Sequence, residues 1–205
     1  MNNKTLILAS NNEHKIIEVR AILGPGYKIV KQSDYNIKPI PETGLNFEEN
    51  AIIKATGVFE ATGITTIADD SGLVVDALNG APGVFSARYS GENANDSSNN
   101  VKLLKNMAHL HKKERAARFE CVIALVDKKQ NNLVQTFKGA WNGTILYNPK
   151  GSNGFGYDPL FFDPVIGKSS AELSDEEKNK VSHRAIALAA LKEHIKNQKT
   201  KERPL

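Results

Sequence analysis

The sequence of 205 residues has one cysteine, one tryptophan and two methionines, and aromatic residues make up 7% of it. The lone Cys121 excludes an intrachain disulfide and indicates a reducing compartment, so we expect a cytoplasmic protein. No apolar run approaches the ~20 residues of a membrane span. The short apolar run from Thr5 to Ala9 is followed by no pattern typical of signal cleavage, so we expect neither secretion nor a membrane partner.

Length and composition favour a folded, globular chain. At roughly 150 residues per domain the length predicts one domain or one two-lobed unit. Hydrophobic residues make up 40% of the chain and charged residues 24%, close to the averages of folded proteins. Such a chain can bury a core without disulfides or structural metal.

The net charge of +4 raises the question of a nucleic-acid partner. Most of it comes from Lys192 to Leu205, where five Lys and Arg residues face two Glu residues. The rest of the chain is close to neutral, so a basic footprint for a nucleic-acid polymer is not predicted. We place a single two-lobed domain at 1–197 and a basic, frayed tail at 198–205.

Strand and helix patterns alternate along the chain, which predicts a mixed α/β sheet flanked by helices. We expect strands at 5–9, 27–32, 64–68, 73–77, 119–127, 133–137 and 140–147. We expect helices from residue 11 or 12 to 23, at about 47–61 and 95–111, and from 175 onward. Ser10 or Asn11 is expected to cap the first helix. The segment 128–132 is expected to join two paired strands.

The segment Ser10–Lys15 lies between a buried strand and a helix start. Exposed backbone N–H groups and the helix dipole make such a junction an anion site, to which Lys15 adds a charge. It lacks the glycines of a phosphate-binding Walker loop. Taken alone, the segment favours the commoner interpretation, an ordinary capped helix with a solvated lysine.

Asp69 and Asp70 follow a predicted strand and precede Gly72. Side chains of neighbouring strand residues point to opposite faces, so one carboxylate is expected to face a site and the other to support a turn. Adjacent carboxylates need hydrogen bonds or a cation, and Mg²⁺ with phosphate oxygens is a natural match. Glu42 is a possible further ligand. The common interpretation of Asp-Asp-Ser-Gly is a simple turn.

The segment Gly154-Phe-Gly-Tyr-Asp158 combines glycines, which allow close approach of the backbone to a ligand, with aromatic faces. One ring, Phe155 or Tyr157, can stack on a base, and Asp158 can accept hydrogen bonds from base N–H groups. The alternative is a surface turn whose aromatic rings lie in the core.

The final helical region begins with a capping box at Ser174–Glu177. In one continuous helix Lys178 and His183 would lie about 140° apart, too far to meet at one ligand. A break at Val181, with Ser182 capping a new helix, would place His183 and Arg184 in a first turn. The alternative is a solvated basic face. Cys121 shows no sign of thiolate activation and is expected in the core.

Five segments in this order resemble the inosine triphosphate pyrophosphatase family, which includes the bacterial dITP/XTP pyrophosphatases. They are SNNEHK (10–15), ETGLNFEENAIIKA (42–55), ADDSGLVVDALNGAPGVFSARYSG (68–91), GFGYDPLFF (154–162) and AELSDEEKNKVSHRA (171–185). The first block departs slightly, with Ser10 and Asn12 at positions that vary among members. The segment after Asn197 lies outside the resemblance.

The resemblance implies an elongated α/β fold with a long mixed sheet and a substrate cleft between two lobes, usually in a homodimer. It implies a Mg²⁺-dependent house-cleaning hydrolase that splits ITP, dITP and XTP between the α- and β-phosphates, which keeps deaminated purines out of DNA and RNA. Asp70 would be the general base and would bind Mg²⁺ with Glu42, and Lys54 would act beside the phosphates. Substrate contacts would come from Ser10, Asn11, Asn12, Lys15, Ser71, Phe155, Gly156, Tyr157, Asp158, Lys178, His183 and Arg184.

Two other functions are compatible with parts of the sequence. A related pyrophosphatase would act on modified pyrimidine or ordinary nucleotides. A non-catalytic nucleotide- or RNA-binding protein would use the basic tail and show strong salt dependence without turnover. An acid at Asp70 beside lysines disfavours the second, because simple phosphate binding gains nothing from a buried carboxylate.

Overall fold

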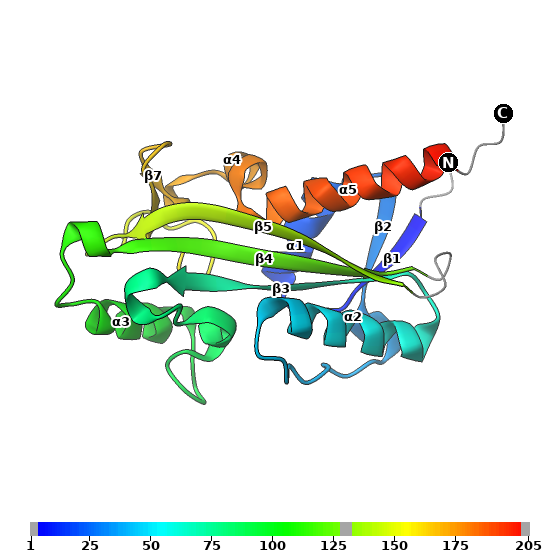
Figure 1. The fold of residues 1–205 in the computed structure, drawn as a ribbon, viewed down its shortest axis with the longest axis horizontal. Coiled ribbons are helices and arrows are strands. Elements are labelled where there is room, and N and C mark those ends of the chain that lie inside the picture. The colour runs from blue at the N-terminus through cyan, green and yellow to red at the C-terminus, as the bar shows by residue number, and fades with distance from the viewer. Residues whose placement is uncertain (1–3, 128–132, 202–205) are drawn as a thin grey trace. The chain divides into compact units, whose positions relative to one another are not determined.

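The computed structural model describes residues 4–127 and 133–201. The strands are β1 Lys4–Leu8, β2 Tyr27–Lys31, β3 Thr66–Val75, β4 Ala116–Val126, β5 Val134–Ile145, β6 Phe161–Asp163 and β7 Lys168–Ser169. The α-helices are α1 Glu13–Leu23, α2 Phe47–Thr62, α3 Asp96–Asn106, α4 Asp175–Val181 and α5 His183–Lys201 (Figure 1). Short 3-10 helices lie at Gln32–Tyr35, Asp76–Leu78, Gly83–Arg88, Lys112–Glu114 and Ser170–Glu172.

The strands form one mixed sheet in the order β2-β1-β3-β4-β5-β6-β7. β1 pairs in parallel with both β2 and β3, and β6 pairs antiparallel with β5 and β7. The prediction of a mixed α/β sheet with flanking helices is therefore confirmed. The chain divides into two compact units. Unit 1 comprises 4–70, 121–127, 133–139 and 184–201 of the described residues, and unit 2 comprises 71–120 and 140–183.

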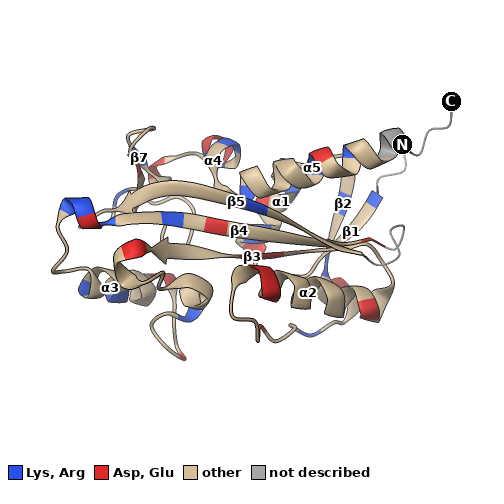
Figure 2. Ribbon diagram, viewed as in Figure 1, with Lys and Arg blue, Asp and Glu red and all other residues tan. Residues whose placement is uncertain are grey.

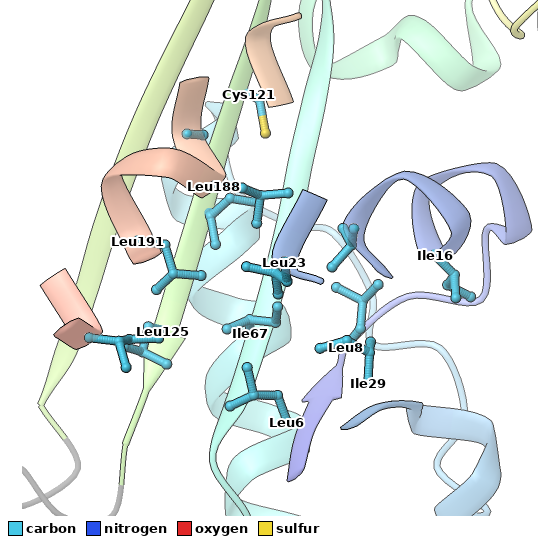
Figure 3. Close-up of a cluster of buried hydrophobic side chains, with 14 residues drawn as sticks. Leu6, Leu8, Ile16, Leu23, Ile29, Ile67, Cys121, Leu125, Leu188 and Leu191 are labelled. Atoms are coloured by element: carbon cyan, nitrogen blue, oxygen red, sulfur yellow. The ribbon is translucent and has the colours of Figure 1, made fainter. Parts of the chain in front are cut away.

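Each unit has its own hydrophobic core. In unit 1, side chains of β1, α1, β3, β4 and α5 pack together, among them Leu6, Ile16, Ile67, Leu125 and Leu188 (Figure 3). In the last helix, Leu188, Leu191 and Ile195 are all buried. In unit 2, β3, α3, β4, β5 and the segment after Tyr157 contribute the core, which includes Leu73, Leu103, Phe119, Trp141 and Phe161.

Two predicted breaks in strands are wrong. The Asp69–Gly72 segment is not a turn, because β3 runs without interruption from Thr66 to Val75. Side chains from neighbouring helices satisfy both aspartates, so the strand can continue through them. Likewise the strands expected at 133–137 and 140–147 are one strand, β5. The segment expected to join β4 to β5, 128–132, lies outside the described residues.

Helix ends differ from prediction in three places. Asn12, rather than Ser10 or Asn11, caps α1, and its side chain accepts a hydrogen bond from the Lys15 N–H. α3 ends at Asn106 instead of His111; the carbonyl of Met107, which follows, accepts a hydrogen bond from Arg115 at 2.8 Å. α5 continues to Lys201, so the part of the expected tail at 198–201 is helical, and 202–205 lie outside the described residues.

Candidate functional site

Asp69 and Asp70 lie at the centre of β3, inside unit 1, and their side chains have different partners. Asp69 contacts Lys15 of α1 and Arg184 of α5, whereas Asp70 contacts Lys54 of α2. This is the alternation expected of neighbouring residues on a strand. Figure 2 shows the acidic segment within β3. The prediction that the two carboxylates point to opposite faces is therefore confirmed, whereas the prediction that one of them supports a turn is wrong, because β3 is continuous here.

Asp69 is a buried anion surrounded by donors, and its side chain is 0% exposed. Arg184 Nε donates to Asp69 Oδ2 at 2.8 Å, Lys15 Nζ pairs with Oδ1, and the Cys121 thiol donates to Oδ2 at 3.1 Å. Burial opposes ionisation of this carboxyl, but Arg184 and Lys15 outweigh it and hold its pKa well below the usual range. Asp69 is therefore ionised at neutral pH.

Arg184 lies in the first turn of α5, as the predicted helix break requires. The structure confirms that break, with α4 ending at Val181 and Ser182 in an extended conformation. The Arg184 side chain is 1% exposed and its guanidinium contacts both Asp69 and Glu18 of α1. Burial opposes its charge, but Asp69 and Glu18 outweigh burial and raise the pKa of Arg184. In this structure Arg184 holds protein carboxylates together.

Asp70, Glu42 and Lys54 form a second cluster in unit 1. The Lys54 ammonium donates to Glu42 Oε1 at 2.6 Å, to Asp70 Oδ1 at 2.8 Å and to the Asp69 backbone carbonyl at 2.8 Å. Burial raises the pKa of the Asp70 carboxyl, with Lys54 and Lys15 opposing it. Burial works against the charge of Lys54, but Asp70 and Glu42 outweigh it and raise the Lys54 pKa. The sequence prediction that these three residues act together is compatible with this convergence.

The loop that carries Glu42 is fixed at its end by α2. Gly44 N–H donates to the Asn50 side chain at 2.7 Å, and a side chain at position 44 would come within 2.6 Å of Glu49 Cβ. Asn46 caps α2 by accepting from Glu49 N–H. Only glycine fits position 44, because any Cβ would push the loop away from the helix.

The segment Ser10–Lys15 joins the end of β1 to α1. The Ser10 hydroxyl accepts from Asn12 N–H at 3.2 Å, and the Asn12 side chain caps the helix. Asn11 and Asn12 are exposed, while Lys15 reaches inward to Asp69. The segment thus presents an exposed helix N-terminus, the local geometry that suits an anion.

In unit 2 the two aromatic side chains of the Gly154–Asp158 segment differ in burial. Tyr157 is buried in the core and donates its hydroxyl to the Ser86 carbonyl at 2.8 Å, so it is not the stacking ring. Phe155 is half-buried, and the Lys178 ammonium lies 4.7 Å from its ring centre. The choice left open by the sequence therefore favours Phe155.

Asp158 is occupied by the protein itself. Its Oδ2 accepts from Lys178 Nζ at 2.6 Å and from Phe155 N–H at 2.9 Å, and its Oδ1 accepts from the Ser170 hydroxyl at 2.8 Å. The side chain is buried. In this structure Asp158 shapes the segment and holds Lys178, where the sequence suggested that it would accept hydrogen bonds from a base.

The remaining predicted substrate contacts also lie in unit 2. His183 is buried and stacks on Phe119, with ring centroids 4.9 Å apart. Ser71 is half-buried and follows Asp70 on β3. Gly156 has φ +62° and its backbone contacts α3, through Asp96 and Asn100.

Several residues around Asp69, and two on α3, were not predicted from the sequence. Asp69 was assigned to a turn, and Glu18 was not identified. Lys15 and Glu18 lie three residues apart on α1, a spacing that places them on one face, but nothing in the sequence indicates that Arg184 lies beside them. Asp96 and Asn100 were missed too, although their i,i+4 spacing at a helix start was a weak signal.

Within 4–127 and 133–201, no group of three or more His, Cys, Asp or Glu side chains could by itself hold a metal ion. In that same part of the chain, no helix is both long and apolar enough to cross a bilayer.

Comparison with known proteins gives a consistent result. The model of the Ham1 family matches residues 6–194. A dITP/XTP pyrophosphatase of Xanthomonas oryzae pv. oryzae is 47% identical over 94% of this chain and 97% of its own length. A dITP/XTP pyrophosphatase of Vibrio cholerae is 46% identical over 96% of this chain and 99% of its own length.

Solved structures of similar proteins have the same fold as this chain. The Ham1 protein of Staphylococcus aureus superposes with a TM-score of 0.86 at 41% identity, covering 95% of this chain and 100% of that one. A nucleoside-triphosphatase, or dITP/XTP pyrophosphatase, of Mycobacterium abscessus gives 0.75 at 42% identity, with 91% and 98% coverage. The resemblance inferred from the five sequence segments is confirmed.

Proposed function

Because this chain belongs to the Ham1 family, we propose that it hydrolyses the non-standard purine nucleotides ITP, dITP and XTP to the monophosphate and pyrophosphate. Near-complete coverage by relatives named dITP/XTP pyrophosphatase supports the reaction. The observation that carries the chemistry is the convergence of Asp70 and Glu42 on the Lys54 ammonium.

The charges of unit 1 indicate why such an enzyme would need a metal ion. Three cationic side chains, of Lys15, Lys54 and Arg184, are paired with four anionic ones, of Glu18, Glu42, Asp69 and Asp70. The cluster as a whole is therefore not positive. A triphosphate carries several negative charges, so its binding here requires a cation in addition to the lysines.

Mg²⁺ fits the donors that are present. Glu42 and Asp70 direct carboxylate oxygens to one cation, the Lys54 ammonium, and the Asp69 carbonyl does the same. Oxygen donors are those that Mg²⁺ prefers, and it is commonly bound by one or two carboxylates completed by substrate phosphates. Glu42 and Asp70 would hold the ion, which when bound neutralises phosphate oxygens.

Asp70 is suited to act as the general base. Burial raises its pKa toward neutrality, so its carboxylate is a better proton acceptor than an exposed aspartate. It would take a proton from water while the water oxygen bonds to phosphorus and pyrophosphate leaves. Lys54, in contact with Asp70, keeps the base oriented, and Lys15 and the N–H groups at the start of α1 bind phosphate oxygens.

Base recognition is assigned to unit 2. Phe155 would stack on the purine, and the ammonium of Lys178, a donor with no acceptor, matches a 6-keto oxygen. An adenine 6-amino group would instead face that donor with another donor. Mispairing of buried polar groups of this kind can discriminate more strongly than shape.

The same proposal includes the cellular role and the assembly. Removing ITP, dITP and XTP would keep deaminated purines out of DNA and RNA. The resemblance implies a homodimer, which analytical ultracentrifugation would test. The single Cys121 favours a cytoplasmic location, which cell fractionation would test.

The deciding experiment measures pyrophosphate released from ITP, dITP, XTP, GTP, ATP and dUTP, with Mg²⁺ and with EDTA. We expect rapid turnover of the first three nucleotides and loss of turnover with EDTA. Equal turnover of ATP and ITP would contradict the 6-keto selectivity, and fastest turnover of dUTP would assign the protein to pyrimidine substrates instead. Full activity in EDTA would contradict the metal requirement.

A further inference from the structure

Helix α3 holds the peptide group that follows the candidate stacking ring, Phe155. Gly156 N–H donates to Asp96 Oδ2 at 2.6 Å, and the Gly156 carbonyl accepts from Asn100 Nδ2 at 2.8 Å. Both polar backbone groups of one residue are thus bound by side chains of a single helix. We call Asp96 and Asn100 the α3 clamp.

The clamp is built on a rigid part of α3. Asn95 caps the helix and forms a reciprocal capping box with Ser98. Asp96 lies in the first turn, where the helix dipole stabilises a carboxylate. Asn100 follows four residues later, on the same face. Their side chains therefore approach the loop from a fixed base.

The chemistry of Asn100 shows what it contributes. Because the Gly156 carbonyl is an acceptor, the side-chain amide must turn its N–H₂ group toward the loop. Within the described residues, the buried Asn100 Oδ1 then has no hydrogen-bond partner. A buried acceptor without a partner is unfavourable. The hydrogen bond from Asn100 Nδ2 to the Gly156 carbonyl offsets the cost of the unsatisfied Asn100 Oδ1.

The clamp completes the anchoring of the Gly154–Asp158 segment on both sides of Phe155. Asp158 accepts from Phe155 N–H, and Tyr157 is tied to Ser86 through its hydroxyl. Gly156 has φ +62°, a conformation that side chains rarely adopt. These bonds do not involve the backbone of Gly156, which is held by α3 instead.

We propose that Asp96 and Asn100 are positioning residues for base recognition, which hold the Phe155 backbone in the orientation that stacks the ring on the purine. This inference rests on the proposed function. It adds two residues on α3 that would act through Gly156 without touching the phosphates. Their loss should weaken binding of the base while leaving phosphate chemistry in unit 1 intact.

The test compares kcat and KM for ITP in Asp96→Ala, Asn100→Ala and the wild-type protein. We expect KM to rise roughly three- to tenfold in each, the factor that corresponds to the net free energy of one lost hydrogen bond. We expect kcat to change less than about twofold. We expect the effects in the double variant to be less than additive, because both side chains hold one residue, Gly156. The inhibition constant of inorganic triphosphate, which has no base, should stay unchanged.

Two variants serve as controls. Asp96→Asn keeps an oxygen that can accept from Gly156 N–H and should restore most of the wild-type KM. Asn106→Ala makes the same truncation as Asn100→Ala on the same helix, but its amide bonds to Tyr89 at 2.7 Å and not to Gly156; KM should not rise. Hydrogen exchange of the 154–158 segment should be faster in the two clamp variants only.

The outcomes separate the two proposals. A wild-type protein that does not release pyrophosphate from ITP would overturn the proposed function. Wild-type turnover with unchanged KM in both alanine variants would overturn the clamp alone. A parallel weakening of inorganic triphosphate would also overturn it, since that result indicates general loosening of the fold.

Discussion

Asp69 and Arg184 form an ion pair that is sealed from solvent, with Arg184 Nε 2.8 Å from Asp69 Oδ2 and side-chain exposures of 1% and 0%. The pair joins the middle of β3 to the first turn of α5. Lys15 binds the other carboxylate oxygen and Glu18 binds the guanidinium, both from α1. One buried network therefore fixes the start of two helices against the strand that carries Asp70.

Asp69→Asn should destabilise the protein strongly. Removing Asp69 leaves Glu18 to balance the buried Arg184 and takes away the carboxylate that pairs with Lys15. Breaking a buried pair in this way costs about 3–5 kcal/mol of unfolding free energy. Urea unfolding followed by circular dichroism measures the loss. The double variant Asp69→Asn, Arg184→Gln should recover part of it, because both charges are then removed. A loss below about 1 kcal/mol in the single variant would contradict the role of the pair.

The pH dependence of stability should reveal the same carboxyl group. Its folded-state pKa is lowered, so its contribution is complete above the unfolded value near 3.9 and is lost as pH falls through the folded pKa. The free energy of unfolding should therefore fall below about pH 4 in the wild type. Asp69→Asn should show a shallower fall over that range. Parallel curves for the two proteins would exclude Asp69 as the source.

Asp70 should behave in the opposite way although it is the next residue. Burial raises its pKa, so the folded state favours the protonated form, and ionisation at neutral pH costs stability. Asp70→Asn should therefore abolish pyrophosphate release from ITP and lower the free energy of unfolding less than Asp69→Asn does, because relief of the buried charge offsets the lost ion pair and Glu42 still balances the Lys54 ammonium. Catalytic groups are often kept at a cost in stability. Retained turnover would refute its role as base, and a loss of unfolding free energy as large as that of Asp69→Asn would refute the offset by burial.

Much of the fold is readable from the sequence because its signals are local. The helix break before His183 follows from the angle between Lys178 and His183 and from a serine that can stand between helices; the structure confirms it. Hydrophobic spacing likewise predicted α1 and α2 to within a few residues. These features depend on residues within one or two turns of each other.

The continuity of β3 was not predictable, because it depends on distant residues. Asp-Asp-Ser-Gly is a turn sequence unless cations satisfy its carboxylates. Those cations come from distant parts of the chain. Lys15 and Arg184 lie 54 and 115 positions from Asp69, and Lys54 lies 16 positions from Asp70, so only folding brings them together. For the same reason the sequence indicated that lysines and Arg184 would meet phosphate, but not that each would have a protein carboxylate as partner.

Cys121 should be inert in the folded protein. Burial raises the pKa of its thiol, and the neighbouring Asp69 raises it further, so the reactive thiolate is scarce at neutral pH. Iodoacetamide at pH 8 should leave the native protein unmodified by mass spectrometry and should label it once in urea. Rapid labelling without denaturant would mean that the segment around Cys121 opens readily.

Gly154→Ala should damage base recognition more than stability. Gly154 has φ +75°, and an added Cβ would lie 2.0 Å from Asp158 Oδ2, the atom that binds Lys178 and the Phe155 N–H. The carboxylate must move, which disturbs Phe155 and Lys178 together. We expect KM for ITP to rise at least tenfold, with a loss of unfolding free energy of about 1–3 kcal/mol.

Gly156→Ala is the matched control: its φ is also positive, at +62°, but no atom lies within 4 Å of the added Cβ. The smaller rise in KM should therefore occur in Gly156→Ala, and an equal rise in both variants would show that backbone strain, not the clash with Asp158, is responsible.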